Sequence, residues 1–113
     1  MLIRRPLRSL TGHGTFETVF RTGRRVEGLY LTLIAAANPD GGRCGYVISR
    51  KVAPRAVDRN RLRRKLREAL RAQPAAMARH DIVLRVTRAR NRVEQDAAAA
   101  EAARLLTELA LRT

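Results

Sequence analysis

Hydrophobic positions along this chain follow the period of a helix in some segments and the period of a strand in others. Phe16, Val19 and Phe20 recur at helical spacing within residues 11–22, so they predict a short helix with one apolar face. Gly23 follows as a natural helix end. The first element with a clear period is therefore expected to be a short amphipathic helix.

Strand periodicity appears in three later segments. Residues 29–36 alternate on a period of two, residues 44–49 are rich in strand-forming side chains, and residues 81–87 alternate again. The segment Asn-Pro-Asp-Gly-Gly at 38–42 carries dense turn chemistry between the first two strands. The pattern therefore predicts that these two strands form an antiparallel hairpin.

Two longer helices are predicted in the second half of the chain. The first covers residues 56–73 and is closed by Pro74. Its apolar stripe consists of Leu62, Leu66, Ala69 and Leu70. Residues 92–112 are rich in Ala, Leu and Glu and predict a final helix. The order of elements indicates an α+β fold, a compact sandwich in a single domain over residues 1–113, with a basic arm at 1–10.

The net charge of the chain indicates what kind of partner the protein binds. Its 24 basic and 10 acidic residues give a formal net charge of +14 and a pI near 11.8, and such self-repulsion indicates a polyanionic partner. All the basic residues except Lys51 and Lys65 are arginines, whose planar fork bonds phosphates and stacks on bases. Ten of the basic residues fall within residues 50–71. Nucleic acid is therefore favoured over a membrane surface.

The helix predicted over residues 56–73 carries its arginines around the arc opposite its apolar stripe. Like charges one turn apart, such as Arg63 and Arg67, each cost about 0.2 to 0.5 kcal/mol. Arg59 and Arg61 near the helix start also oppose the helix dipole. A solvated helix face is the alternative interpretation, but a helix optimised only for its own stability would avoid this repulsion, so a nucleic-acid-binding ridge is favoured.

The remaining polar residues form no motif of protein catalysis. Cys44 is the only cysteine, so we expect a small apolar strand residue, no disulfide and a reducing cytoplasm. His13 and His80 stand outside any ligand-spaced cluster, so turn or surface roles are expected. Asp58 is expected to cap a helix or to interact with its dipole. No apolar run approaches the ~18 residues of a membrane span, and no nucleophile motif or phosphate loop is present.

The segment Arg59, Asn60 and Arg61, continued by Leu-Arg-Arg-Lys-Leu-Arg-Glu at 62–68, resembles the signature of the bacterial ribonuclease P protein subunit family. The resemblance extends to residues 16–20, 45–51 and 81–88, which are similar to the first helix of the family, to the strand before its basic helix and to its last strand. It covers most of residues 10–90, while the final helix matches only in type.

This resemblance implies a two-layer α/β sandwich with a left-handed βαβ crossover, shared with a domain of a small-subunit ribosomal protein. It implies a subunit that binds a catalytic RNA and the 5′ leader of precursor tRNA, while the RNA cleaves with Mg²⁺ and the protein alone does not. No membrane or DNA partner and no metal of its own are expected. The residues implied to contact the catalytic RNA are Arg59, Asn60, Arg61, Arg63, Arg64 and Arg67. Those implied along the leader cleft are Phe16, Phe20, Ser49 and Lys51.

Several alternatives stay open at this point. Phe16 and Phe20 lie at i,i+4 and are by default a core stripe, whereas the resemblance favours rings that stack on unpaired bases. Tyr30 and Tyr46 are weaker candidates for the same role. Residues 51–57 depart from the usual turn of the family before its basic helix, so the conformation there is open. A structural ribosomal protein, an autonomous carboxylate nuclease and a DNA-binding module are the rival functions.

Overall fold

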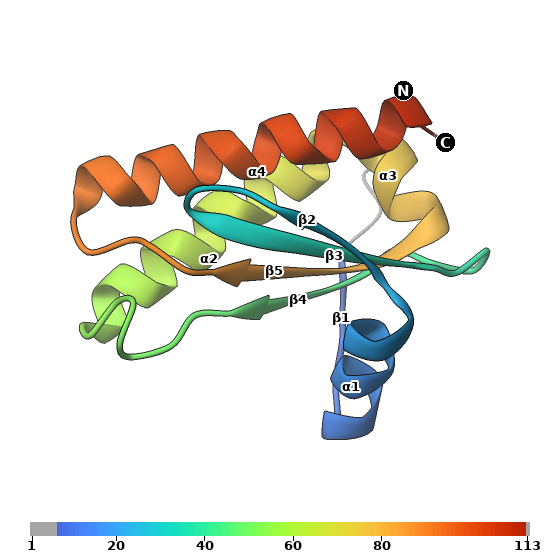
Figure 1. The fold of residues 1–113 in the computed structure, drawn as a ribbon, viewed down its shortest axis with the longest axis horizontal. Helices are drawn as coiled ribbons and strands as arrows, with labels where there is room; N and C mark the ends of the chain where they lie inside the picture. Colours follow the sequence, from blue (N-terminus) through green and yellow to red (C-terminus); the bar gives the residue numbers. More distant parts are fainter. Residues whose placement is uncertain (1–6, 113) are drawn as a thin grey trace.

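The computed structural model describes residues 7–112, apart from the side chains of residues 13 and 14. Five strands and four helices follow one another in this part of the chain (Figure 1). They are β1 (Arg8–Ser9), α1 (His13–Thr22), β2 (Arg24–Glu27), β3 (Leu31–Ala37), β4 (Arg43–Val47), α2 (Ala56–Arg71), α3 (Pro74–Arg79), β5 (His80–Val86) and α4 (Arg92–Arg112). The α+β fold class predicted from the sequence is confirmed.

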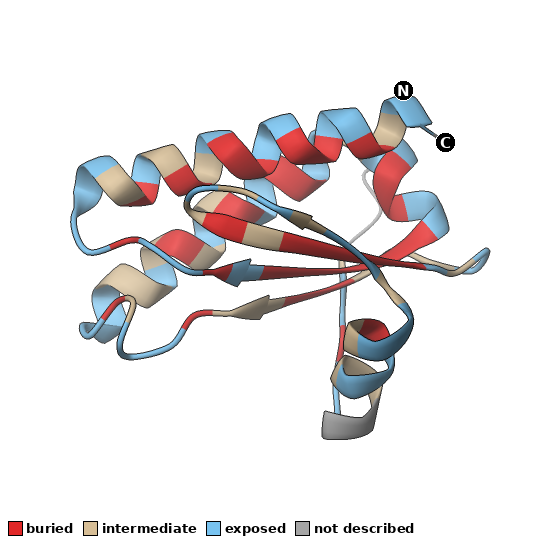
Figure 2. Cartoon of the chain, in the orientation of Figure 1, coloured by how far each residue is buried: buried red, intermediate tan, exposed pale blue. Residues whose placement is uncertain are grey.

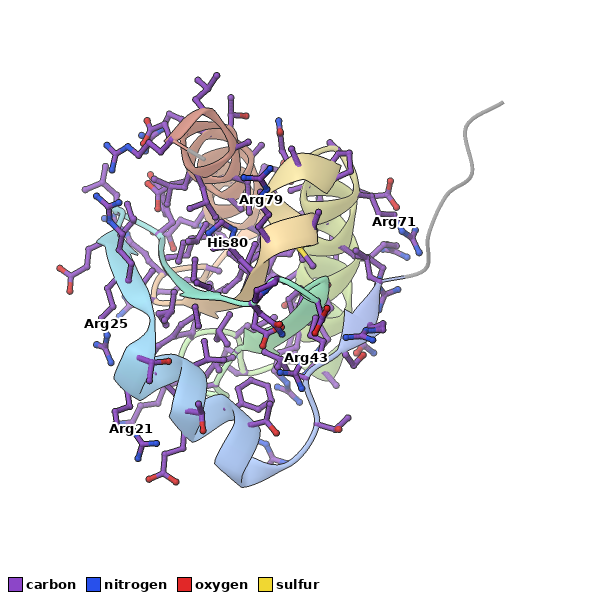
Figure 3. The ribbon with its side chains drawn as sticks, turned by 90° about the vertical axis from the view of Figure 1, so that its right-hand side faces the viewer. Arg21, Arg25, Arg43, Arg71, Arg79 and His80 are labelled. Carbon is purple, nitrogen blue, oxygen red and sulfur yellow. The ribbon has the colours of Figure 1, made fainter. Side chains whose placement is uncertain are left out.

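The strands form one sheet with helices on both faces. Helices α2, α3 and α4 cover one face, and α1 covers part of the other, as Figures 1 and 3 show from two directions. Figure 2 shows buried positions along the central strands and on the inner sides of α2 and α4. The larger core cluster includes Leu31, Leu33, Leu62, Leu66, Leu84 and Leu106. The smaller cluster, on the face that α1 covers, consists of Leu10, Val19, Ile34, Ala36 and Val83.

The order of strands across the sheet is β1, β4, β5, β3, β2. Strand β3 is antiparallel to β2 and β5, whereas β4 is parallel to β5 and β1. The predicted hairpin between residues 29–36 and 44–49 is therefore wrong, because β5 lies between the two strands. Strand β5 is buried on both faces at Ile82, Val83 and Leu84, and a strand of this kind is stable at the covered centre of a sheet.

Three elements were not predicted from the sequence. Strand β2 is a polar edge strand, held by backbone pairing to β3, so it shows no apolar alternation. Pro74 begins α3, since proline is tolerated in the first turn of a helix. Strand β1 lies in the expected basic arm and pairs Ser9 with Cys44, while residues 1–6 of that arm lie outside the described residues. The predicted end of α1 before Gly23 is confirmed.

A buried carboxylate explains why β3 starts at Leu31 rather than at residue 29. Glu101 of α4 accepts the backbone N–H groups of Leu29, Tyr30 and Leu31 at 2.9, 2.8 and 3.0 Å. A Cβ added at Gly28 would lie 2.1 Å from a carboxylate oxygen of Glu101. The turn between β2 and β3 is therefore fastened to α4, with the Leu29 side chain 76% exposed.

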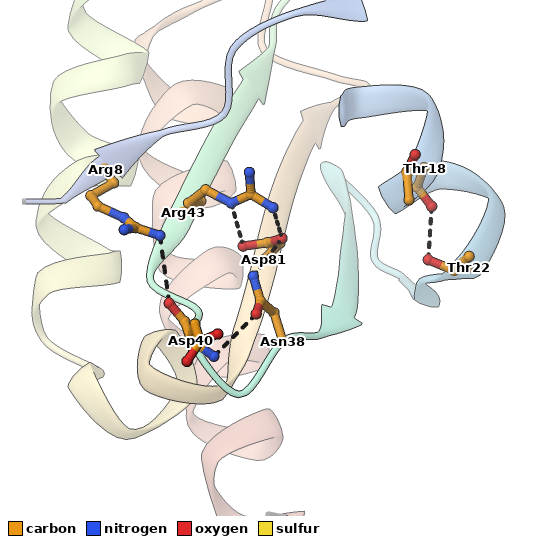
Figure 4. Close-up of polar contacts among 7 residues, drawn as sticks. All are labelled: Arg8, Thr18, Thr22, Asn38, Asp40, Arg43 and Asp81. Atoms are coloured by element: carbon orange, nitrogen blue, oxygen red, sulfur yellow. Dashed lines mark hydrogen bonds and ion pairs between the residues drawn. The ribbon is translucent and has the colours of Figure 1, made fainter. Parts of the chain in front are cut away.

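Asp81, at the start of β5, joins three segments of the sheet (Figure 4). Its carboxylate accepts from Arg43 Nε at 3.1 Å, from Arg43 Nη2 at 2.6 Å and from Asn38 Nδ2 at 3.1 Å. Burial acts to raise the pKa of Asp81, but the hydrogen bonds from Arg43 and Asn38 prevail and hold the pKa below its ordinary value. The contacts fix the turn after β3 and the parallel register of β4 against β5.

Two residues that were assigned roles from the sequence are buried in the fold. His80 is buried rather than on the surface, so the surface interpretation is wrong, and its Nδ1 lies 2.9 Å from the carbonyl oxygen of Ala76. Cys44 is a buried free thiol on β4, which confirms its prediction as a small apolar strand residue. The side chain of His13 lies outside the described residues.

Candidate nucleic-acid interface

The turn before α2 is ordered by the first arginine of the basic helix. Arg59 Nη1 donates to the carbonyl oxygens of Ala53 and Pro54 at 2.9 and 2.8 Å, which defines the conformation that the sequence left open. The N-cap position belongs to Arg55, whose side chain makes no capping hydrogen bond. Asp58 lies in the first turn, where a carboxylate interacts favourably with the helix dipole, so the dipole role fits and the cap does not.

Helix α2 has the two faces that its sequence predicts. Leu62, Leu66, Ala69 and Leu70 are its buried residues. The opposite side carries the basic ridge, which consists of Arg59, Asn60, Arg61, Arg63, Arg64 and Arg67. Arg64 and Arg67 are exposed, and Arg63 Nη1 donates to Asn60 Oδ1 at 3.1 Å. Within residues 7–112, Arg64 makes no hydrogen bond or ion pair, so all its donors are available to a ligand.

One arginine of the basic ridge is directed into the protein instead. Arg61 Nη1 donates to Gln95 Oε1 at 2.8 Å, and its Nη2 lies 3.1 Å from Asp96 Oδ1. Lys65 Nζ contacts the same Asp96 oxygen at 2.9 Å. Lys65 and Arg61 together lower the pKa of Asp96. Because Gln95 is 1% exposed and the Arg61 side chain 19%, Arg61 chiefly ties α2 to α4.

The two phenylalanines of α1 lie against the other face of the sheet. The ring centroids of Phe16 and Phe20 are 6.5 Å apart, and both side chains are half-buried against the smaller core cluster. A Cβ added at Gly45 would lie 2.5 Å from Phe16 Cζ, so this ring packs directly on the β4 backbone. Each ring thus contacts the core on one side and is accessible on the other, so the packing role is confirmed and the stacking of these rings on bases stays a prediction.

Ser49 and Lys51 line a hollow of about 760 Å³ at one end of the sheet. The hollow is lined by Leu29, Val47, Ser49, Lys51, Val52, Arg85, Val86, Thr87, Arg88, Arg90 and Glu94. Phe16 and Phe20 do not line it, but Val47 packs against the cluster beneath these rings and also lines the hollow. The structure therefore brings Ser49 and Lys51 together in the hollow, while Phe16 and Phe20 pack on the same sheet face and are connected to the hollow through Val47.

Arg85 is a residue of this surface that motif-based reasoning missed. It is the one exposed position of β5, where every other residue is buried. Its neighbour in the alternating pattern, Val83, belongs to the cluster beside α1, so Arg85 points to the same face. No ion pair or hydrogen bond engages the Arg85 side chain within the described residues. A single arginine within the otherwise apolar run of residues 82–86 is the signal that marks it in the sequence.

Arg88 is held at the rim of the hollow by two contacts. Its Nε lies 2.6 Å from Glu94 Oε2, and its guanidinium carbon lies 5.6 Å from the centroid of the Tyr30 ring. Glu94 also accepts the backbone N–H of Arg90 at 2.9 Å. Tyr30 is therefore engaged with a cation rather than open for stacking on a base, and Tyr46 points toward α2, on the face away from α1.

In the described part of the chain, His, Cys, Asp and Glu side chains form no group of three that could hold a metal ion. No helix there is both long and apolar enough to span a bilayer. The arrangement is one of cations and half-exposed rings, which can bind phosphates and bases without reacting with them.

A family model described as Ribonuclease P matches residues 5–110 of the chain. The chain is 40% identical over 98 residues to the ribonuclease P protein component of Acidothermus cellulolyticus, and the match covers 83% of this chain and 81% of that protein. With other curated relatives, at similar or higher identity, the chain spans only about half of their length.

Two solved structures have the same fold. The RNase P protein of Staphylococcus aureus matches with a TM-score of 0.68 at 19% identity, over 89% of this chain and 90% of that one. The RNase P protein of Thermotoga maritima matches with a TM-score of 0.63 at 26% identity, over 84% of this chain and 88% of that one. The mixed sheet and its helices are thus shared with bacterial proteins of this kind.

Proposed function

The chain belongs to the ribonuclease P protein family, and from that premise we propose that it binds the catalytic RNA of ribonuclease P together with the 5′ leader of precursor tRNA. The RNA cleaves the leader with Mg²⁺ and so forms the mature 5′ end, while the protein alone does not cleave. The proposed compartment is the cytoplasm, which a single free cysteine suits. The observation that carries this proposal is the pair of cationic surfaces, the basic ridge and the hollow, on different elements of one fold.

The basic ridge is the proposed contact with the catalytic RNA. Arg64 and Arg67 project from a helix whose other side is fixed in the core, so their positions are set before RNA arrives. One guanidinium group can donate two parallel hydrogen bonds to a phosphate. Its positive charge also lowers the repulsion between RNA strands that must approach one another. Arg59 and Arg61 contribute charge to the same surface while their hydrogen bonds hold the helix in place.

The sheet face beside α1 is the proposed path of the leader. Lys51 and Arg85 supply charge for its phosphates, and Phe16 and Phe20 offer half-exposed rings on the same sheet face. Stacking on an aromatic ring contributes about 1 to 3 kcal/mol per base and tolerates any base. Binding of this kind suits a substrate segment whose sequence varies between precursors.

The proposed gain in catalysis comes from differential binding. Mature tRNA lacks the leader, so contacts along the hollow strengthen binding of the substrate and leave the affinity for the product unchanged. Precursor is then preferred over product without any protein group at the reacting phosphate.

The test compares cleavage and binding of precursor tRNA by a bacterial ribonuclease P RNA at low millimolar Mg²⁺, with and without this protein. A substrate without a leader is the control. We expect the protein to restore cleavage and to tighten binding only when the leader is present. If it changes neither, and instead co-sediments with ribosomal subunits, a ribosomal scaffold is the better assignment.

A further inference from the structure

A second concave site shares no lining residue with the hollow. It is a cavity of about 210 Å³ between β1, β4 and the C-terminal half of α2, and we call it the notch. It is lined by Leu7, Ser9, Cys44, Tyr46, Arg67 and Arg71. The volume is far above the roughly 10 to 15 Å³ that one water molecule needs, so a small ligand group fits together with solvent.

The register of the edge strand builds the notch. Ser9 of β1 lies directly opposite Cys44 of β4, so their side chains share the face that α2 covers. Tyr46, two residues further along β4, points to the same face. Arg67 and Arg71 lie one turn apart on α2 and close the cavity, and Figure 3 shows Arg71 on the side of α2 where β1 runs.

The lining of the notch is cationic and rich in donors. It contains two guanidinium groups and two hydroxyl groups, and within residues 7–112 no carboxylate lines it. Arg71 Nη1 lies 3.2 Å from Glu68 Oε1, but a guanidinium has five N–H donors, so most of them stay available. Arg67 and Arg71 repel each other at i,i+4, and an anion placed between them relieves that repulsion.

The Tyr46 hydroxyl stays protonated and can donate a hydrogen bond. Burial raises the pKa of Tyr46, the neighbouring Cys44 thiol adds to the rise, and Arg67 opposes it without reversing it. The hydroxyl lies 3.7 Å from Cys44 Sγ, and both residues line the notch. It therefore keeps its proton throughout the neutral range and can offer it to an anionic oxygen.

We propose that the notch binds one phosphate group, and that in the holoenzyme this group is a phosphate of the RNA backbone. The second part of this proposal rests on the RNA-binding function proposed above. Arg67 and Arg71 supply charge and N–H donors, and the hydroxyls of Tyr46 and Ser9 complete the donor set. The RNA-contacting surface then extends past the basic ridge to the end of α2 and to strand β1.

The notch itself is tested with inorganic phosphate on the full chain, at constant ionic strength and with chloride as the reference anion. Arg71→Gln and Tyr46→Phe remove one donor each. Arg79→Gln is the matched control, because Arg79 is an exposed arginine on α3 outside the notch (Figure 3). In ¹H–¹⁵N NMR titrations we expect phosphate to shift the Ser9 amide saturably in the wild type and in Arg79→Gln, with an affinity at least about tenfold lower in the other two variants.

The second arm measures the affinity for ribonuclease P RNA as a function of salt. Arg71→Gln is expected to make the slope of log affinity against log salt concentration shallower by about 1, as the loss of one phosphate contact does, while Arg79→Gln leaves it unchanged.

The outcomes separate the notch from the proposed function. Equal behaviour of Arg71→Gln and Arg79→Gln in both experiments overturns the notch but leaves the proposed function standing. If the wild type binds no RNA, the proposed function fails, whereas a phosphate response lost in Arg71→Gln still supports the notch. Ser9→Ala replaces Tyr46→Phe if the latter loses its fold by circular dichroism.

Discussion

Arginines that look alike in the sequence make different contacts in the fold. Arg59 and Arg61 donate hydrogen bonds to groups of the protein itself, whereas Arg64 and Arg85 have no partner among the described residues. A guanidinium binds a phosphate with donors that are not already engaged. At the residue scale, the availability of donors therefore separates arginines that can bind RNA from arginines that support the helix.

Arg85→Gln tests this view on the sheet face. A hydrogen bond to a charged group contributes about 1.5 to 3 kcal/mol, so the affinity for precursor tRNA in the holoenzyme is expected to fall by at least about tenfold. Because Arg85 is exposed and engages no partner within residues 7–112, the free energy of unfolding should change by less than about 0.5 kcal/mol. Arg92→Gln, at the exposed start of α4, is the matched control. An equal loss of affinity for leaderless tRNA would remove Arg85 from the leader path.

Phe20→Leu separates the two roles of a half-buried ring. Leucine keeps most of the apolar contact with the core cluster, so the loss of stability should stay below about 1.5 kcal/mol. It cannot stack on a base, so precursor affinity should fall by an amount in the range of about 1 to 3 kcal/mol. Thermal unfolding and precursor binding measured on the same variant decide the matter. A lowered Tm with unchanged precursor affinity would make Phe20 a core residue only.

At the scale of elements, α4 holds the basic helix in place. Arg61→Ala leaves the buried Gln95 without its donor and frees Asp96 from one of its two cations. A buried polar group without a partner costs about 1 to 3 kcal/mol, and we expect a loss of stability of that size in urea unfolding. Arg64→Ala should weaken RNA binding with almost no change in stability. If Arg61→Ala unfolds like the wild type, its side chain is not what joins α2 to α4.

At the same scale, Asp81 should make the free energy of unfolding depend on pH. Its pKa is lowered in the folded state by Arg43 and Asn38, so its contribution to stability is complete above the unfolded value of about 3.9 and is lost as the pH falls through the lower folded value. Asp81→Asn should destabilise the protein by about 1 to 3 kcal/mol at pH 7. Urea unfolding should show this difference shrinking below about pH 4. A difference that stays constant with pH would contradict the ion pair.

The whole molecule carries a formal charge of +14, and ten of its basic residues fall within residues 50–71. Neutralising about six phosphates predicts a slope of roughly −4 to −5 for log affinity of the catalytic RNA against log salt concentration. Filter binding between low and physiological salt measures this slope. A slope near zero would exclude the electrostatic part of the proposed interface.

The sequence alone determined the local features, because they depend on neighbours along the chain. The apolar stripe of α2, its basic ridge, the end of α1 before Gly23 and the long final helix all follow from periodicity and composition. The family resemblance of residues 59–61 added the expected partners. These features were visible because side chains three or four residues apart share one face of a helix.

Only the tertiary structure decided which strands are neighbours and which donors are free. Strand β5 lies between β3 and β4, at the centre of the sheet. Its residues Ile82, Val83 and Leu84 are apolar on both faces, so they are most stable where helices cover the sheet on both sides. The hydrogen bond of Arg61 to Gln95 and the pairing of Ser9 with Cys44 join residues that lie 34 and 35 positions apart. Contacts between distant segments leave no period in the sequence, because the chain between them is free to vary.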